Sequence, residues 1–357
     1  MKVLLKAILI STALVISLPQ LSKAQISNPK AELTKLDSDK IWPQTLEGSH
    51  FNEFWNYHFY FDNGIVMHII FNAANFGRLK SPVTGLRVSV YNLDDQVHQL
   101  QREYSLEHLI LDKENQRFQN RAEREIYFEG LPPDSHRIRI YTTKDGVTYD
   151  IDLKFDDIQP GFKMGDGKYG IGNETIGIVT HIPYATVTGT VAVNNSRADV
   201  KGTGYMDHTY QDQTTTTLID KGFRFTNHSD PDNWDILYFM LPNNTERGRT
   251  IGHRVTKKDG EITIQQARRV DEIVESRTFD KQVARSLKLH TGSNRSLQLV
   301  RSADHEKFAI LGELGRIARR AARTFLGGEV IDFRGEATLI ESGHRPITGH
   351  YNYFIVD

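Results

Sequence analysis

The residues best suited to chemistry lie in one short stretch, Gly202-Thr203-Gly204-Tyr205-Met206-Asp207-His208-Thr209-Tyr210. An aspartate in an apolar cavity is costly as an anion, so Asp207 could persist there as a proton donor near neutral pH. A protonated acid can give its proton to a carbon–carbon double bond, and the resulting carbocation either takes up water or closes a ring. His208 would reprotonate Asp207 or orient a water molecule. The ring faces of Tyr205 and Tyr210 would stabilise the cation.

A purely structural role for Asp207 and His208, as a buried ion pair or a turn cap, is the alternative. The stretch follows a β-patterned run at 184–193 and a turn at 194–196, which predicts that it is the returning strand of a hairpin. Neighbouring residues of a strand face opposite ways. We therefore expect Asp207 and Tyr205 on one face and His208 and Met206 on the other, unless the glycines introduce a bulge.

A second group of candidates lies in an aromatic β-hairpin. The runs 53–61 and 65–71 flank an Asn63-Gly64 dipeptide, which predicts two strands joined by a tight turn. With a two-residue turn, one face would carry Trp55, Tyr57, Phe59, Phe61, Val66, His68 and Ile70, and the other Phe54, His58, Tyr60, Met67, Ile69 and Phe71. Both faces are apolar, which favours a barrel wall with a lined cavity over a one-sided surface sheet. Trp55 and Tyr57 are then candidates for ligand contact.

Three histidines, His58, His68 and His181, are predicted to form a polar cluster at the mouth of this cavity. A metal site is one interpretation, but no His-Glu-x-x-His or comparable ligand spacing occurs, so no metal is predicted. A hydrogen-bonded wall position is the alternative for each histidine. The acidic run 230–235 lacks the glycine and final glutamate of a calcium loop, which indicates a turn. There is no cofactor-binding motif and no Gly-x-Ser-x-Gly hydrolase elbow, so no cofactor is expected.

Together with the Val-x-Gly-x-Val run at 187–191, the stretch around Asp207 resembles the Gly-x-x-x-x-Asp-His signature of the lipocalin-like carotenoid hydratase (hydroxyneurosporene synthase) family, which includes tocopherol-cyclase-like proteins. The hairpin resembles the family's Glu-Trp-Trp-Tyr-Phe start and Asp-Gly turn, with Phe54 in place of the first tryptophan and Asn56 inserted before Tyr57. Tyr210 and Gln211 stand where the family has Trp-Gly. The resembling blocks are 53–71, 147–155, 183–212 and 233–244.

The resemblance implies an all-β fold of two lipocalin-like (calycin-type) antiparallel barrels in tandem. With a boundary near residue 214, the expected parts are a signal peptide at 1–24, a leader at 25–41, an N-terminal lipocalin-like domain at 42–214 and a C-terminal one at 215–357. The resemblance also implies that Asp207 is the proton donor, and that a cavity near the domain interface holds a lipophilic isoprenoid for cofactor-independent, acid-initiated hydration, cyclisation or isomerisation. A non-catalytic periplasmic carrier of a hydrophobic ligand is the competing class.

The N-terminal residues are typical of a secretory signal, with Lys2 and Lys6 before an apolar run at 7–18 and small residues at Ser22 and Ala24. We expect cleavage near Ala24 and a secreted or periplasmic protein. The absence of cysteine excludes disulfides, thiolate nucleophiles and Cys-zinc sites and fits a bacterial exported protein. The formal charge is -1 for the whole chain, which gives no positive field to attract nucleic acid, so no nucleic-acid partner is expected.

One C-terminal helix is predicted at 305–325, because apolar residues recur there at helical spacing and Gly327-Gly328 would end it. Its second half is basic, with Arg316, Arg319, Arg320 and Arg323. This pattern permits peripheral contact with an anionic membrane, and packing on or between the barrels is the alternative. A Gly-rich segment at 161–177 lacks the Gly-Lys-Ser/Thr ending of a phosphate loop and is predicted to be a mobile rim loop.

Overall fold

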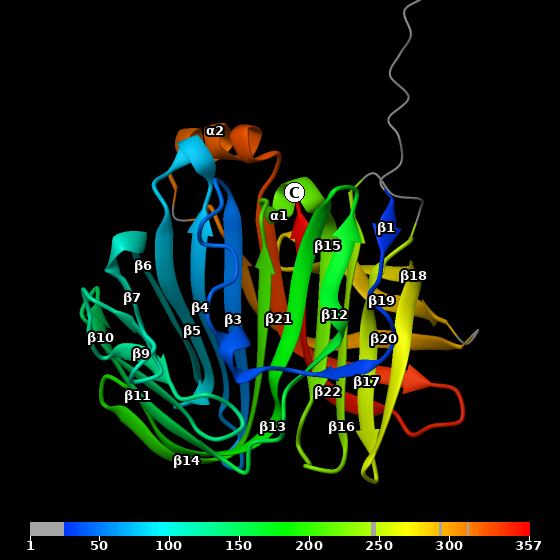
Figure 1. The fold of residues 1–357 in the computed structure, drawn as a ribbon, viewed down its shortest axis with the longest axis horizontal. Helices are drawn as coiled ribbons and strands as arrows, with labels where there is room; N and C mark the ends of the chain where they lie inside the picture. Colours follow the sequence, from blue (N-terminus) through cyan, green and yellow to red (C-terminus); the bar gives the residue numbers. More distant parts are fainter. Residues whose placement is uncertain (1–24, 244–247, 293–294, 313) are drawn as a thin grey trace, which may run out of the picture.

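The computed structural model of the protein describes residues 25–243, 248–292, 295–312 and 314–357. Nearly all regular structure in these ranges is antiparallel β-strand, arranged as a large curled sheet followed by a closed barrel (Figure 1). The predicted all-β fold class is confirmed. The expected signal peptide at 1–24 lies outside the described residues.

The N-terminal unit is a 14-stranded sheet. Its strands are β1 (Ile26–Ser27), β2 (Leu33–Lys35), β3 (Phe51–Phe61), β4 (Val66–Asn75), β5 (Val83–Leu93), β6 (Gln96–Ser105), β7 (Leu109–Asp112), β8 (Arg117–Asn120), β9 (Ile126–Glu129), β10 (His136–Lys144), β11 (Val147–Asp156), β12 (Phe162–Ile171), β13 (Glu174–Val193) and β14 (Ser196–Gln211). The main path is β6-β5-β4-β3-β14-β13-β11-β10-β9-β8-β7, and β12 joins β1 and β2 to β13. The path ends at β6 and β7, and the sheet curls so that Tyr149 on β11 donates a 2.7 Å hydrogen bond to the Gln99 carbonyl on β6.

The C-terminal unit is a closed barrel in which each strand pairs with the next and β15 pairs with β22. Its strands are β15 (Ile219–Asn227), β16 (Trp234–Pro242), β17 (Ile251–Lys258), β18 (Glu261–Thr278), β19 (Lys281–Thr291), β20 (Ser296–Ala309), β21 (Val330–Glu341) and β22 (Ile347–Val356). The helices are α1 (Thr215–Leu218), α2 (Arg316–Leu326) and three short 3-10 turns, η1 (Ser38–Ile41), η2 (Gly77–Leu79) and η3 (Leu106–His108). Among the described residues, no helix has both the length and the apolar character that crossing a bilayer requires.

The β3–β4 hairpin is present, but its turn has three residues instead of the expected two. Phe61 and Ile65 flank the turn, the Gly64 N–H donates a 2.9 Å hydrogen bond to the Phe61 carbonyl, and Gly64 has a φ of 83°. The extra residue places His58 directly opposite His68. A shift of one residue exchanges the two faces of a strand, so the prediction that His68 shares a face with Trp55 is wrong.

Aromatic side chains fill the inner face of the N-terminal sheet, where the sequence predicted a lined cavity. Trp55, Tyr57 and Phe59 on β3 are 0% exposed and belong to one continuous core that includes Phe71 and Met206. The opposite, outer face of the same strands carries Asn56, His58, Tyr60 and His68. The polar candidates on β3 and β4 therefore lie outside the apolar core.

Two segments expected to be irregular form β structure instead. Residues 25–41, predicted to be a loose leader, contain β1 and β2, which pair with β12, and they bury Ile41. The Gly-rich segment at 161–177 forms β12 and the start of β13. Its glycines permit the positive φ of Gly165 and Gly167 at the irregularity in register between Lys163 and Lys168.

The helix predicted at 305–325 is shorter than expected. Residues 305–309 belong to β20, and α2 begins only at Arg316, after Gly315 as its N-cap residue. Phe308 packs instead against the Arg87 guanidinium, 3.8 Å from the ring centroid. The apolar residues of β20 satisfied a helical spacing by coincidence, whereas the flanking glycines favour a break.

Candidate functional site

Strand β14 divides the candidate residues between two faces. Tyr205 and Asp207 lie on the outer face, toward the barrel, whereas His208 and Tyr210 lie on the inner face with Met206. The ladder between β14 and β3 runs from Gly202 to Gln211 without a shift in register. The predicted alternation is therefore confirmed, and Asp207 and His208 belong to separate groups.

Asp207 forms a buried ion pair that joins the two units. Its carboxylate accepts a 2.9 Å hydrogen bond from the Asn56 amide and a 3.0 Å hydrogen bond from Arg224 Nη2, and Arg224 Nε lies 2.9 Å from its other oxygen. Asp207 is 1% exposed. A guanidinium at this distance stabilises the ionised carboxylate. Asp207 therefore lies against a guanidinium and an amide, and not in the apolar cavity expected from the sequence.

Two rows of polar side chains face each other between the sheet and the barrel. The register of β14, β3, β4 and β5 aligns Tyr205, His58, His68 and Ser89. The register of β15, β22, β21 and β20 aligns Arg224, Asn352, Arg334 and Glu306. Ser89 Oγ donates a 3.1 Å hydrogen bond to Glu306, which connects the two rows. We call the region between these two rows of side chains the interface site.

Four histidines gather at the interface site: His58 and His68 from the sheet, and His228 and His350 from the barrel. The Tyr60 ring stacks on His228 at 4.1 Å and on His350 at 4.4 Å, measured between ring centroids. The rings of His58 and His68 are 4.6 Å apart. The site therefore brings imidazoles and phenols together from both units.

Burial keeps these imidazoles neutral. Burial, followed by the charges of Arg224 and Arg334, holds the pKa of His58 well below its usual value, and burial followed by His58 does the same to the pKa of His68. Burial also lowers the pKa of His228 to about 3 and that of His350 to about 4. A neutral imidazole has a nitrogen that can accept a proton, so the site holds several bases at neutral pH.

Several buried polar atoms of the interface site have no hydrogen-bond partner among the residues that the structure describes. They include both ring nitrogens of His68, Nε2 of His228 and Nδ1 of His350. A buried polar atom without a partner is destabilising, and native proteins seldom keep one without a reason. The convergence of these atoms indicates where the polar groups of a ligand, or water, would bind.

A charged network extends the interface site. Arg87 of the sheet pairs with Glu306 and, at 3.2 Å, with Asp332 of the barrel. The Tyr91 hydroxyl also donates to Glu306, and Arg334 pairs with Asp332 at 3.1 Å. Buried charges of this kind are tolerated only when they are paired, so the network fixes how the barrel sits on the sheet.

The inner-face candidates form a second polar group. His208 Nε2 lies 2.9 Å from Glu53 Oε2, and the His208 ring stacks on Trp55 at 4.5 Å. The ring of His181 lies 6.0 Å from that of His208, and the Tyr57 hydroxyl lies 3.0 Å from His136 Nε2. Of the predicted residues, Trp55, Tyr57, His181 and His208 therefore lie in this group, apart from Asp207.

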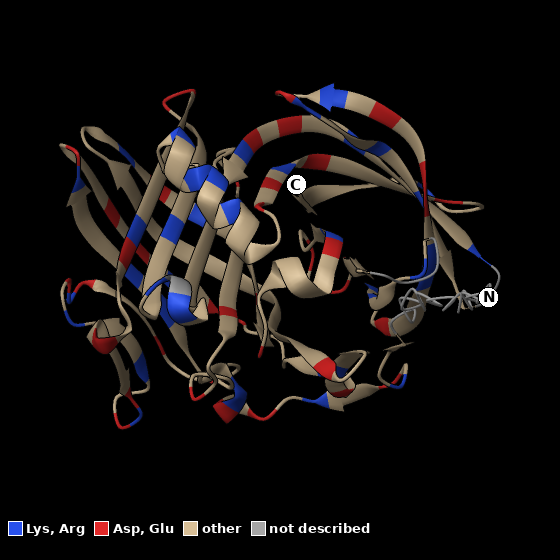
Figure 2. Cartoon of the chain, turned by 90° about the horizontal axis from the view of Figure 1, so that it is seen from above, with Lys and Arg blue, Asp and Glu red and all other residues tan. Residues whose placement is uncertain are grey.

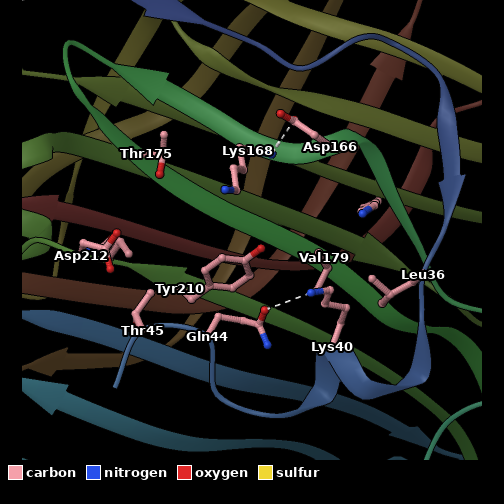
Figure 3. Close-up of a pocket in the computed structure, with 12 residues that line it drawn as sticks. Leu36, Lys40, Gln44, Thr45, Asp166, Lys168, Thr175, Val179, Tyr210 and Asp212 are labelled. Atoms are coloured by element: carbon pink, nitrogen blue, oxygen red, sulfur yellow. Dashed lines mark hydrogen bonds between the residues drawn. The ribbon is translucent and has the colours of Figure 1, made fainter. Parts of the chain in front are cut away.

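A pocket of about 310 Å³ opens beside the inner-face group (Figure 3). Tyr210 lines it, with its ring 5.2 Å from that of His208. The wall carries charges of both signs, from Lys40, Lys163, Lys168, Asp166 and Asp212. Its polar lining differs from the apolar cavity predicted from the sequence, and Asp207 does not line it.

Sequence reasoning missed the barrel half of the interface site. Arg224 and Thr226 alternate with Phe223 and Phe225 along β15, and His228 follows just beyond it. His350 precedes the alternating Tyr351 and Tyr353 of β22. This alternation of polar with aromatic residues was the available signal. Nothing in the sequence indicated which strands of the sheet they would meet.

Among the described residues, no group of three or more His, Asp or Glu side chains is arranged to hold a metal ion. The acidic run 230–235 forms a turn, in which the Asp230 carboxylate accepts hydrogen bonds from the backbone N–H groups of Asp232 and Asn233 at 2.7 and 3.0 Å. The interpretation of this run as a turn is therefore confirmed.

No protein-family model matches the sequence, and no match to a curated protein was found. Solved structures do match, and the fold that the chain shares with them is a two-unit, lipocalin-like β fold. The identities of 11–12% in these matches establish a shared fold and nothing finer.

Three of these structures cover almost the whole chain. A protein of Nitrosomonas europaea, provisionally assigned as AttH, matches with a TM-score of 0.62 over 90% of this chain and 97% of its own. Kievitone hydratase from Nectria haematococca matches with a TM-score of 0.54 over 92% and 97%. CghA in complex with Sch210972 matches with a TM-score of 0.56 over 87% and 89%.

Proposed function

We propose that the protein acts at the interface site on a hydrophobic, isoprenoid-like small molecule, by cofactor-independent, acid-initiated hydration, cyclisation or isomerisation of the carotenoid hydratase type. The observation that carries the proposal is the buried Asp207–Arg224 pair at an interface site where, among the described residues, ring nitrogens of the neutral His68, His228 and His350 lack partners. The sequence resemblance around Asp207 and the fold shared with kievitone hydratase, whose name states a hydration, support it.

The proposed reaction begins with a proton on Asp207. A ligand that draws Arg224 away leaves a buried acid without its counter-ion, which favours the protonated form. Transfer of this proton to one carbon of a double bond leaves a cation on the other carbon. The faces of Tyr60 and Tyr205 would stabilise that cation.

The fate of the cation decides the product. In hydration, a water molecule adds to the cation and gives up a proton to a neutral imidazole such as His58. In cyclisation, a second double bond of the ligand attacks the cation. In isomerisation, a carbon next to the cation loses a proton. In each reaction Asp207 donates the first proton and a histidine accepts the last one. Burial and the charge of Asp207 raise the pKa of Tyr205 well above its usual value, so its hydroxyl remains neutral throughout.

The test compares Asp207→Asn with the unchanged protein. Both are incubated with acyclic isoprenoids and prenylated phenols in water enriched in deuterium and heavy oxygen, and the products are analysed by mass spectrometry. We expect Asp207→Asn to lose at least about a hundredfold in turnover, because removal of a general acid has effects of this size. Heavy oxygen in the product indicates hydration, and deuterium without oxygen indicates cyclisation or isomerisation.

The matched control is Asp235→Asn. Asp235 forms a second buried ion pair, with Arg254 Nη2 at 2.6 Å, within the barrel, so its loss should destabilise the protein without touching the interface site. Equal loss of turnover in both variants would contradict the proposal. If the unchanged protein and both variants bind the ligand equally, and the ligand carries no label, the protein is a carrier and not an enzyme.

The proposal includes export of the protein, with cleavage near Ala24. An N-terminal sequence that begins near Gln25, on protein isolated from the periplasm or the medium, tests this part.

A further inference from the structure

Helix α2 (Arg316–Leu326) lies across one end of the molecule, where its arginines form a concentrated group of positive charge (Figures 1 and 2). The helix contains four arginines and no acidic residue. One side of it is fixed to the barrel: Ala322 is buried, Arg319 pairs with Glu329 at 2.8 Å, and Arg323 pairs with Asp357 at 3.1 Å. Its orientation on the barrel is therefore defined.

The side of α2 turned away from the barrel is apolar. Ile317 is 88% exposed and Phe325 is 62% exposed, and the exposed Ala321 lies between them. Because residues four apart share a face of a helix, these three form one stripe. Leu314, just before the helix, adds a further exposed apolar side chain. Single exposed apolar residues are common, but a continuous exposed stripe on a helix needs a partner.

Positive charge lies beside this apolar stripe. Arg316 and Arg320 are exposed, and within the described part of the chain neither has an ion-pair partner, in contrast to Arg319 and Arg323. An apolar stripe next to unpaired arginines is the pattern of helices that lie in the interface of an anionic bilayer. If this face of α2 met only water, the apolar stripe would remain exposed. A nucleic acid would bind the arginines but would offer the stripe no apolar surface.

We propose that α2 docks the protein on an anionic lipid surface, with Ile317 and Phe325 inserted at the level of the headgroups and Arg316 and Arg320 on the lipid phosphates. The helix remains attached to the barrel through Arg319 and Arg323. Docking does not depend on the reaction proposed above, and the two proposals fail independently.

The test is flotation with lipid vesicles. The chain from Gln25 onward contains every described residue and avoids the apolar N-terminal segment; the full-length chain is run in parallel. We expect binding to vesicles of phosphatidylcholine mixed with phosphatidylglycerol, weak binding to phosphatidylcholine alone, and release at about 1 M salt, where the screening length falls to about 3 Å.

Two variants address the two halves of the surface. Arg316→Gln with Arg320→Gln should weaken binding about fivefold for each arginine, by the usual contribution of a basic residue near an anionic surface. Ile317→Ser with Phe325→Ser should weaken it about tenfold or more, because the inserted apolar area is lost. All four side chains are exposed, so the variants should fold normally.

The controls carry the same changes elsewhere on the barrel. Ile273→Ser removes an apolar residue that is 50% exposed, and Arg285→Gln removes an exposed arginine; neither should alter binding. The proposal is overturned if the protein binds neither kind of vesicle, or if the α2 variants bind vesicles as well as the controls do. It is also overturned if α2 is the contact between two copies of the chain, which would be seen as a dimer that Ile317→Ser dissociates.

Discussion

At the scale of single residues, His68 is the clearest case of an unsatisfied polar side chain in the interface site. Its imidazole is buried and neutral, and neither nitrogen has a partner in the described part of the chain. Orphaned buried polar atoms are destabilising by about 1–3 kcal/mol. We propose that a ligand of the interface site uses the His68 nitrogens, which lie between the rings of His58 and Tyr91.

We predict that His68→Phe raises the free energy of unfolding by about 1–2 kcal/mol, because a ring of similar size replaces an unsatisfied polar one. Urea denaturation at pH 7 measures this change, with the exposed His344→Gln as a control. A decrease in stability would show that His68 already has its hydrogen bonds in solution, and would remove the argument for a ligand there.

At the scale of elements, the two glycines of the Asp207 stretch serve close packing rather than a bulge. A Cβ atom on Gly202 would lie 2.0 Å from the Tyr60 carbonyl oxygen, and one on Gly204 would lie 2.6 Å from a Val187 methyl group. Both contacts are shorter than atoms allow. The glycines therefore let β14 approach β3 and the core closely, which sets the distance between Asp207 and Asn56.

We predict that Gly202→Ala lowers the free energy of unfolding by about 1–3 kcal/mol, the usual effect of forcing an extra methyl group into a packed interior. The Asp207–Asn56 contact should lengthen as β14 and β3 separate. Gly315→Ala, where a Cβ would meet open space, should change stability by no more than about 0.5 kcal/mol. Urea titrations of both variants provide the comparison, and equal effects would contradict the packing argument.

The elements also show which properties could be predicted from the sequence. Alternation along β14 correctly separated Asp207 from His208, because the period of a strand is a local property. The face of His68 was wrong, since it depended on whether the β3–β4 turn had two residues or three. Arg224 could not be assigned to Asp207 from the sequence, nor His350 to Tyr60, because strands of two separate units bring each pair together.

At the scale of the whole molecule, buried neutral histidines dominate the dependence of stability on pH. Burial lowers the pKa of seven of them in the folded protein: His58, His68, His136, His181, His228, His253 and His350. In the unfolded chain each has a pKa of about 6.5 and takes up a proton more readily. Their contribution is therefore fully present above about pH 6.5 and is lost as the pH falls toward the folded-state values.

We predict a steep loss of stability between about pH 6.5 and pH 4. Each neutral histidine contributes a slope of about 1.4 kcal/mol per pH unit in this range, so several together can exceed the net stability of an ordinary protein. Thermal unfolding followed by circular dichroism over this range measures the slope. A midpoint that stays constant from pH 7 to pH 5 would contradict the burial of these histidines.

The paired charges between the sheet and the barrel also restrict how the two halves can be recombined. Asp207 with Arg224, and Arg87 with Glu306 and Asp332, each place one partner in either half. A chimera could join this sheet to the barrel of another protein of the same fold. The charges of the sheet would then be buried without partners, unless the new barrel carries a guanidinium and two carboxylates at the positions of Arg224, Glu306 and Asp332. Exchange of halves between such proteins therefore requires that the buried charges match. Compatible barrels can be selected by sequence, from the residues at the three positions that correspond to Arg224, Glu306 and Asp332.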